Sequence, residues 1–245
     1  MEKQTIKALI FGVAIVLAAF LLGDAYLSRS RPEGTISVTG LGKTDFTSDL
    51  IVWEAVFNQQ NQDLQTAYAE LEKDKRSIVS YLTEKGISEQ NMVFSAVSTR
   101  EDRKSKYSDD GRYVGDEFVG YVLSQFVEIE SEDVQLVEQI SREITELLNQ
   151  GVKLYSQPPR YYYTKLSDLK IEMISAATED ARLRAEKISE NSGSELGDLV
   201  SAQMGIFQIT GQNSTESYSW GGTFNTADKE KTASITMKLK YKIED

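Results

Sequence analysis

Two stretches of this chain alternate apolar and polar residues, as half-buried β-strands do. Alternation over residues 35–39 and again over residues 51–57 predicts two strands. The stretch between them, GLGKTDFTSD, is rich in residues that favour turns. We therefore expect the two strands to form a hairpin whose turn contains Gly40 and Gly42.

Helical and strand patterns then follow one another up to residue 166. One helix with apolar residues three and four positions apart is predicted to end at Gly86, and another, beginning near Ser131, at Gly151. Strands are predicted at residues 51–57, 92–103, 118–131 and on each side of Pro158-Pro159. Residues 50–166 thus predict the order β-α-β-β-α-β, a split β-α-β arrangement with two helices on one face of an antiparallel sheet.

Residues 167–245 predict a helix followed by two strands. The helix begins at Ser167-Asp168 and ends at Gly193. The last strand, residues 233–244, alternates apolar residues with Lys238, Lys240 and Lys242, a pattern typical of an edge strand protected against further pairing. The predicted fold class is α+β, with the split β-α-β sheet followed by a C-terminal α-β-β extension.

Arg182 and Arg184 in this third helix are candidate ligand contacts. The small and apolar residues of the helix predict a narrow packing stripe: Ile171, Ile174, Ala177, Ala181, Ala185 and Ile188. Charged residues on the opposite side are spaced to form exposed ion pairs. We therefore interpret the arginines as structural and the alanines as a seam for close packing.

The first 31 residues have the pattern of a membrane-directed segment. Lys3 and Lys7 precede an uncharged apolar run at residues 8–22. This run has the length of the apolar region of a signal peptide and is short for a transmembrane helix of about 20 residues. Two interpretations stay open, a cleaved signal peptide or an uncleaved N-terminal membrane anchor. Either would place the body, residues 34–245, in the cell envelope facing the periplasm, anchored to the inner membrane or free after cleavage.

Composition excludes several kinds of site. The chain has 38 acidic and 27 basic residues, and its net charge of −11 disfavours nucleic acid as a partner. It contains no histidine and no cysteine, which excludes Cys/His zinc sites, thiol nucleophiles and Ser-His-Asp triads. The carboxylates within residues 109–117 lack the spacing of a calcium loop. We assign no catalytic residue, no cofactor and no metal ligand.

Three stretches together resemble the SIMPL domain family, also called DUF541. They are ISVTGLGKTDFTSDLIVWEAVF, AATEDARLRAEKISENSGSELGDLVSAQ and ASITMKLKYKI, and the resemblance covers about residues 34–244. Ala181, Arg184, Ala185 and Gly193 carry its most specific part. Ile188 departs from the small alanine that is often found at this place in the family.

The resemblance implies an exported protein without established catalytic residues. It also implies ring-like or channel-like oligomers, which some members form, and a link to envelope stress. With the N-terminal segment, it predicts a non-enzymatic envelope protein that acts through homo-oligomeric assembly or binding. The alternatives are a periplasmic peptide-binding or chaperone-like module, and a hydrolase that uses carboxylates.

Two aromatic clusters are candidate interface residues. Tyr161 and Tyr163 belong to the run RYYYTK and alternate onto one face of a strand. Tyr218, Trp220 and Phe224 lie in a polar, Gly-rich loop that offers little core of its own. Gly40 and Gly42 could suggest a phosphate loop, but no helix follows them, so we interpret them as part of a turn.

Overall fold

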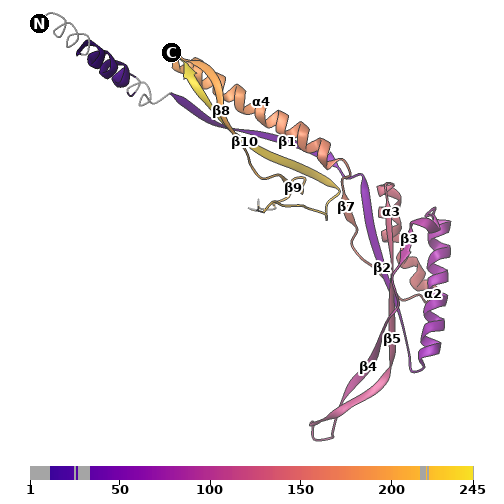
Figure 1. Ribbon diagram of the computed structural model, residues 1–245. Helices are drawn as coiled ribbons and strands as arrows, with labels where there is room; N and C mark the ends of the chain where they lie inside the picture. Colours follow the sequence, from indigo (N-terminus) through magenta and orange to yellow (C-terminus); the bar gives the residue numbers. More distant parts are fainter. Residues whose placement is uncertain (1–11, 25, 27–33, 216–218, 220, 245) are drawn as a thin grey trace, which may run out of the picture. The chain divides into compact units, whose positions relative to one another are not determined.

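The computed structural model describes residues 12–24, 26, 34–215, 219 and 221–244 (Figure 1). Residues 12–24 are helical, and the remaining residues of the predicted N-terminal segment lie largely outside the described ones. Within the described part of the chain, no helix has both the length and the apolar character that a membrane crossing requires.

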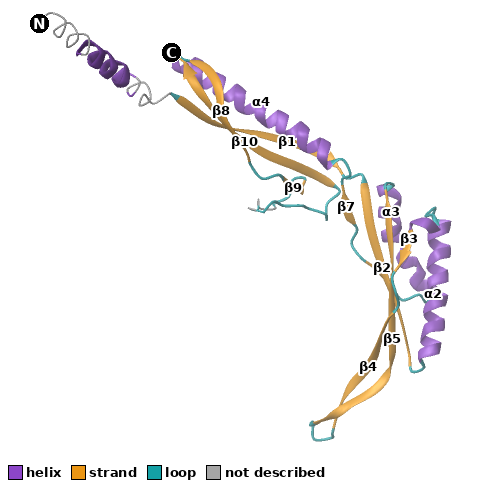
Figure 2. Cartoon of the chain, in the orientation of Figure 1, coloured by secondary structure: helices purple, strands orange, loops and turns teal. Residues whose placement is uncertain are grey.

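The chain divides into two compact units, each assembled from separate stretches of sequence. Unit 1 consists of residues 1–41, 178–204 and 237–245, and unit 2 consists of residues 42–177 and 205–236. Both are built from antiparallel strands and helices (Figure 2). The α+β class predicted from the sequence is confirmed.

Unit 2 contains a six-stranded sheet with the order β3-β5-β2-β6, in which β4 also pairs with β5 and β7 with β2. Its strands are β2 (Leu50–Asn61), β3 (Met92–Phe94), β4 (Ser98–Tyr107), β5 (Tyr113–Ser131), β6 (Leu154–Ser156) and β7 (Arg160–Tyr162). Strand β5 lies between β2 and β3, and β2 lies between β5 and β6, as the split β-α-β arrangement requires.

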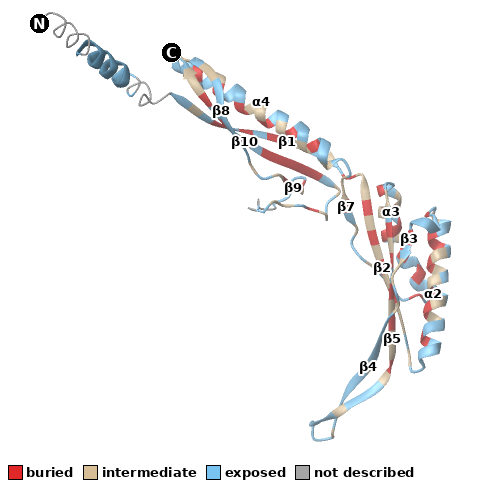
Figure 3. Cartoon of the chain, viewed as in Figure 1, coloured by how far each residue is buried: buried red, intermediate tan, exposed pale blue. Residues whose placement is uncertain are grey.

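Two helices cover one face of this sheet, α2 (Leu64–Glu84) and α3 (Val134–Glu143), the second continued by a 3₁₀ segment, η2 (Ile144–Gln150). Asp63 caps α2 by accepting a hydrogen bond from the Thr66 amide at 2.8 Å. Gly151, with φ of 85°, ends η2 in the left-handed conformation that the sequence pattern predicts. Helices and sheet enclose a core around Trp53, Phe57 and Leu71, which are fully buried (Figure 3).

A second sheet has the order β1-β10-β8, with β9 also paired to β10. Its strands are β1 (Thr35–Thr47), β8 (Glu195–Met204), β9 (Gln208–Gly211) and β10 (Glu230–Glu244), and its helix is α4 (Leu166–Ser192). Thus β1, α4 and β10 contribute residues to both units.

The predicted hairpin between residues 35–39 and 51–57 is wrong. Gly40 and Gly42 lie inside β1, which continues to Thr47, and β1 and β2 belong to different sheets. Gly42 serves close packing instead of a turn. A Cβ atom at Gly42 would lie 2.4 Å from the backbone oxygen of Met173 on α4, so only glycine allows this approach.

The buried stripe of α4 differs from the predicted one in three positions. Ile171 and Ile188 are more than half exposed and Ile174 is half-buried, whereas Ala177, Ala181 and Ala185 are fully buried as predicted. The stripe recurs every four residues: Leu169, Met173, Ala177, Ala181, Ala185 and Ser189. The alanine seam predicted from the sequence is confirmed, but its flanking residues follow a four-residue spacing.

Strand β10 was predicted to lie at an edge, and this is also wrong. It is the central strand, paired with β1 on one side and with β8 on the other. Its apolar residues Met237, Leu239 and Tyr241 are buried, and Lys238 and Lys240 between them are exposed. The lysines therefore do not protect an edge, and β8 occupies the edge position.

Candidate functional site

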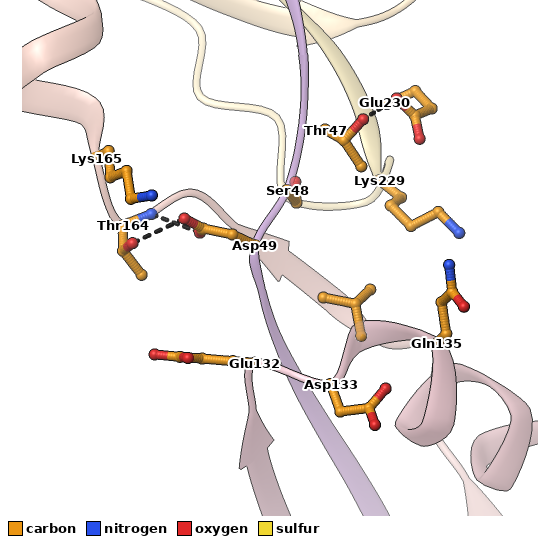
Figure 4. Close-up of a pocket in the computed structure, with 11 residues that line it drawn as sticks. Thr47, Ser48, Asp49, Glu132, Asp133, Gln135, Thr164, Lys165, Lys229 and Glu230 are labelled. Carbon is orange, nitrogen blue, oxygen red and sulfur yellow. Dashed lines mark hydrogen bonds between the residues drawn. The ribbon is translucent and has the colours of Figure 1, made fainter.

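A concave site with a volume of about 700 Å³ lies in unit 2. We call it the unit 2 hollow (Figure 4). Four segments form it: residues 47–49 between β1 and β2, residues 132–135 at the start of α3, residues 164–165 before α4, and residues 229–230 at the start of β10. Its lining is mostly polar and includes four carboxylates and two lysines.

Most of these polar groups connect the segments to one another. The Asp49 carboxylate accepts hydrogen bonds from the Thr164 amide at 2.7 Å and from the Thr164 hydroxyl at 2.8 Å. The Thr47 hydroxyl donates to Glu230 at 2.6 Å. Asp133 caps α3 by accepting from the amide of Leu136 at 3.0 Å. Three of the four carboxylates are therefore engaged in holding the fold.

Lys229 points from this site toward α3, where its ammonium lies 2.9 Å from the Glu138 carboxylate. The hydrogen bond from Lys229 lowers the pKa of Glu138, and the same bond raises the pKa of Lys229. Lys229 is therefore neutralised within unit 2. Its charge contributes little to attracting an anion into the unit 2 hollow.

Ser48 is the one lining residue whose buried side-chain oxygen has no hydrogen-bond partner among the described residues. The residues that the structure describes contain no group of three or more His, Cys, Asp or Glu side chains arranged to hold a metal. The unit 2 hollow is therefore a place where four segments meet and are joined by the polar side chains that line it.

The first candidate interface cluster lies in the interior of unit 2. Tyr161 is 8% exposed and belongs to the hydrophobic core, where burial raises the pKa of its hydroxyl. Tyr163 is half-buried, and its ring packs against Phe46 with ring centroids 4.8 Å apart. Tyr161 thus has little side-chain surface for a partner, and Tyr163 has a limited part of its ring.

The second candidate cluster is described only at Phe224, since Tyr218 and Trp220 lie outside the described residues. Phe224 is 56% exposed, and its ring centroid lies 6.3 Å from that of Phe207. The ammonium of Lys170 lies 5.2 Å from the Phe207 centroid and 5.9 Å from that of Phe224. Phe224 therefore offers exposed aromatic surface beside a cation.

Arg184 connects α4 to β1 in unit 1. Its guanidinium lies 2.9 Å from the Asp180 carboxylate and donates to the carbonyl oxygen of Thr39 at 3.3 Å. Asp180 in turn accepts from the amide of Leu41, and this bond lowers the pKa of Asp180. These contacts give Arg184 a structural role.

Strand β8 is an exposed surface that the sequence patterns did not indicate. It ends the order β1-β10-β8, and among the described strands only β10 pairs with it. Leu199, Val200 and Met204 on this strand are about half exposed. Residues 199–209 include no charged residue and no proline. Charged residues and proline are the ones that usually protect an edge strand. That uncharged run was the available signal, but it identifies an edge only when the strand order is known.

A shallow site lies on the same sheet, lined by Ser37, Ser201, Gln203, Lys238, Leu239 and Lys240, with a volume of about 360 Å³. Lys238 is directly opposite Gln203 on β8, and Lys240 is directly opposite Ser201. Residues that are directly opposite in an antiparallel pair project from the same face. Hydroxyl and amide groups therefore surround the two lysines.

Comparison with known proteins gives a family and no established activity. A family model described as "SIMPL: Protein of unknown function (DUF541)" matches residues 36–241. No curated protein matches the chain. Among solved structures, the chain is similar to the de novo designed protein Ferredog-Diesel, at 19% identity over 46% of this chain and 87% of the designed one, with a TM-score of 0.19.

Proposed function

Because this chain belongs to the SIMPL family, whose function is unknown, we propose a function from its own surfaces. We propose that it is a non-enzymatic protein of the cell envelope that associates with further copies of itself through edge strand β8. The N-terminal segment would direct it there, as an inner-membrane anchor facing the periplasm or as a cleaved signal peptide.

The uncharged second part of the β8 edge, residues 199–204, is the observation that carries this proposal. An exposed strand edge presents unpaired backbone N–H and C=O groups, which a strand of another chain can satisfy. Proteins that stay monomeric usually protect such an edge with lysine or proline, and residues 199–209 contain neither. Leu199, Val200 and Met204 add apolar side chains that a second strand would cover.

The partner strand determines the size of the assembly. Antiparallel pairing of β8 with β8 of a second copy closes a two-fold dimer. Pairing of β8 with the opposite sheet edge, β1 of the next copy, leaves one edge open at each step and produces a ring or a filament. The mass of the assembly therefore distinguishes these two modes.

Light scattering on the chain without residues 1–31 tests the proposal. We expect a mass well above that of one copy. Replacing Leu199 and Met204 together with lysine should weaken self-association at least about tenfold, because lysines at the junction would have to be desolvated. The matched control is Leu183→Lys on α4, since Leu183 is 53% exposed and Leu199 is 51% exposed. A wild-type chain that stays monomeric at every concentration would contradict self-assembly.

The same edge also supports the peptide-binding alternative. An extended peptide could pair with β8 by strand addition, with its side chains against Leu199 and Met204. A monomeric wild-type chain that binds an extended peptide, and loses this binding in the double lysine variant, would favour that function. The carboxylate-dependent hydrolase has less support, because three of the four carboxylates in the unit 2 hollow accept structural hydrogen bonds.

A further inference from the structure

Two charged side chains that line the unit 2 hollow, Glu132 and Lys165, have no partner among the described residues. The other three carboxylates of the lining accept structural hydrogen bonds, and the other lysine, Lys229, pairs with Glu138. Figure 4 shows Glu132 and Lys165 on either side of Asp49. The hollow therefore has one negative and one positive charge that the fold does not use.

The strand register places these two charges on opposite sides of β2. Ile51 on β2 is directly opposite Ser131 on β5 and directly opposite Tyr161 on β7. Neighbouring strands are about 4.8 Å apart, so the backbones of β5 and β7 are about 10 Å apart across β2. Both strands are antiparallel to β2 and end at the hollow, where β5 continues into Glu132 and β7 leads to Lys165.

The lining also offers an amide group to a ligand. The side chain of Gln135, in the first turn of α3, forms no hydrogen bond within the described part of the chain. An amide both donates and accepts, so it can pair with either group of a peptide bond. The volume of about 700 Å³ lies within the range of about 300–1,000 Å³ that is usual for small-ligand sites.

A ligand of a single charge does not match this lining. An anion would meet four carboxylates, and a cation would leave the Lys165 ammonium without a partner and be repelled by it. A molecule with an ammonium group at one end and a carboxylate at the other can pair with both free charges. An extended chain covers about 3.3–3.6 Å per residue, so ends about 10 Å apart correspond to about three residues.

We propose that the unit 2 hollow binds a short peptide of about three residues with free ends. Its ammonium group pairs with Glu132, its carboxylate pairs with Lys165, and Gln135 bonds to a peptide group. This inference does not rest on association through β8, because Leu199 and Met204 belong to unit 1 and every lining residue of the hollow belongs to unit 2.

Calorimetric titration of the full chain in detergent micelles with trialanine tests the proposal. N-acetyl-trialanine lacks the ammonium group, and trialanine amide lacks the carboxylate. Each cap should weaken binding at least about fivefold, because each removes a hydrogen bond between charged groups. The absence of trialanine binding would overturn the proposal. Equal binding of the amide would overturn it in favour of a cation site, and equal binding of alanine in favour of a single amino acid.

Two variants assign each end of the peptide to its side chain. Glu132→Gln should bind trialanine and N-acetyl-trialanine equally and still prefer the carboxylate to the amide. Lys165→Gln should show the reverse pattern. A purely structural effect of either substitution would weaken all three peptides alike and would contradict the assignment. The matched control is Glu130→Gln, since Glu130 is also exposed on β5 but does not line the hollow.

The variant with Leu199→Lys and Met204→Lys separates this inference from the proposed function. It should lose self-association and keep the affinity for trialanine. Loss of trialanine binding in this variant, with normal binding in Glu132→Gln, would show that the peptide pairs with β8 and would overturn the hollow as its site. A monomeric wild-type chain with the expected cap dependence would contradict self-association alone.

Discussion

At the scale of single residues, Gly42 determines how closely β1 and α4 can pack. Its φ is not in the left-handed region, so its role is not a special backbone conformation. A Cβ atom would lie 2.4 Å from the Met173 oxygen and 3.3 Å from the Ala177 Cβ, both on the helix. The helix backbone cannot move away without disturbing the alanine seam.

Gly42→Ala should therefore lower the free energy of unfolding by about 1–3 kcal/mol, the usual cost of overpacking a core. Denaturant unfolding measures the change. The control is Gly34→Ala, where the new Cβ would meet Ile243 at an ordinary 3.6 Å. Equal stability of the two variants would mean that close packing against α4 does not require glycine at position 42.

Lys231 is a buried charge within unit 2. It is 3% exposed, and its ammonium donates to the carbonyl oxygens of Tyr161 at 2.6 Å and of Asn225 at 2.7 Å. Burial lowers the pKa of Lys231, because desolvation disfavours the charged form. The folded chain therefore releases this proton at a lower pH than the unfolded chain.

At pH values between the lowered pKa of Lys231 and the ordinary lysine pKa of about 10.4, the unfolded chain binds more protons than the folded chain. The free energy of unfolding should therefore rise with pH in this window. In Lys231→Met this contribution is absent. We expect the free energy of unfolding of the wild type, minus that of the variant, to increase with pH in that window and to be constant below it. The raised pKa values of Tyr81 and Tyr161 act in the opposite direction but in both proteins, so the difference removes them. A difference that does not change with pH would show that Lys231 titrates normally.

At the scale of elements, the sequence predicted the features that depend on residues close together in the chain. Polar residues near Ser131 and at Ser167-Asp168, and glycines at helix ends, are local signals, and the helices begin and end close to them. The alternating patterns likewise located most strands. The order β-α-β-β-α-β followed from these positions, because few topologies accommodate it.

Local patterns could not determine which strands pair with one another. Gly42 looks like a turn residue unless the helix that packs on it, more than 120 positions later, is known. The lysines of β10 look like edge protection unless β8 is known to lie outside them. The exposed edge of β8 depends on this strand order, which is why sequence analysis selected aromatic residues instead.

At the scale of the whole molecule, net charge opposes the proposed self-association. Each copy carries a net charge of −11, so copies that meet through β8 repel one another. This repulsion is electrostatic and is screened over about 10 Å at 0.1 M salt, compared with about 30 Å at 0.01 M.

Added salt should therefore strengthen self-association. Screening reduces the repulsion between copies, so the mass measured by light scattering should rise from about 0.01 M to 0.1 M salt at constant protein concentration. The Leu199→Lys and Met204→Lys variant should lose this response. If salt weakened self-association, the contact would depend on attraction between opposite charges, and the apolar edge of β8 would not be its main cause.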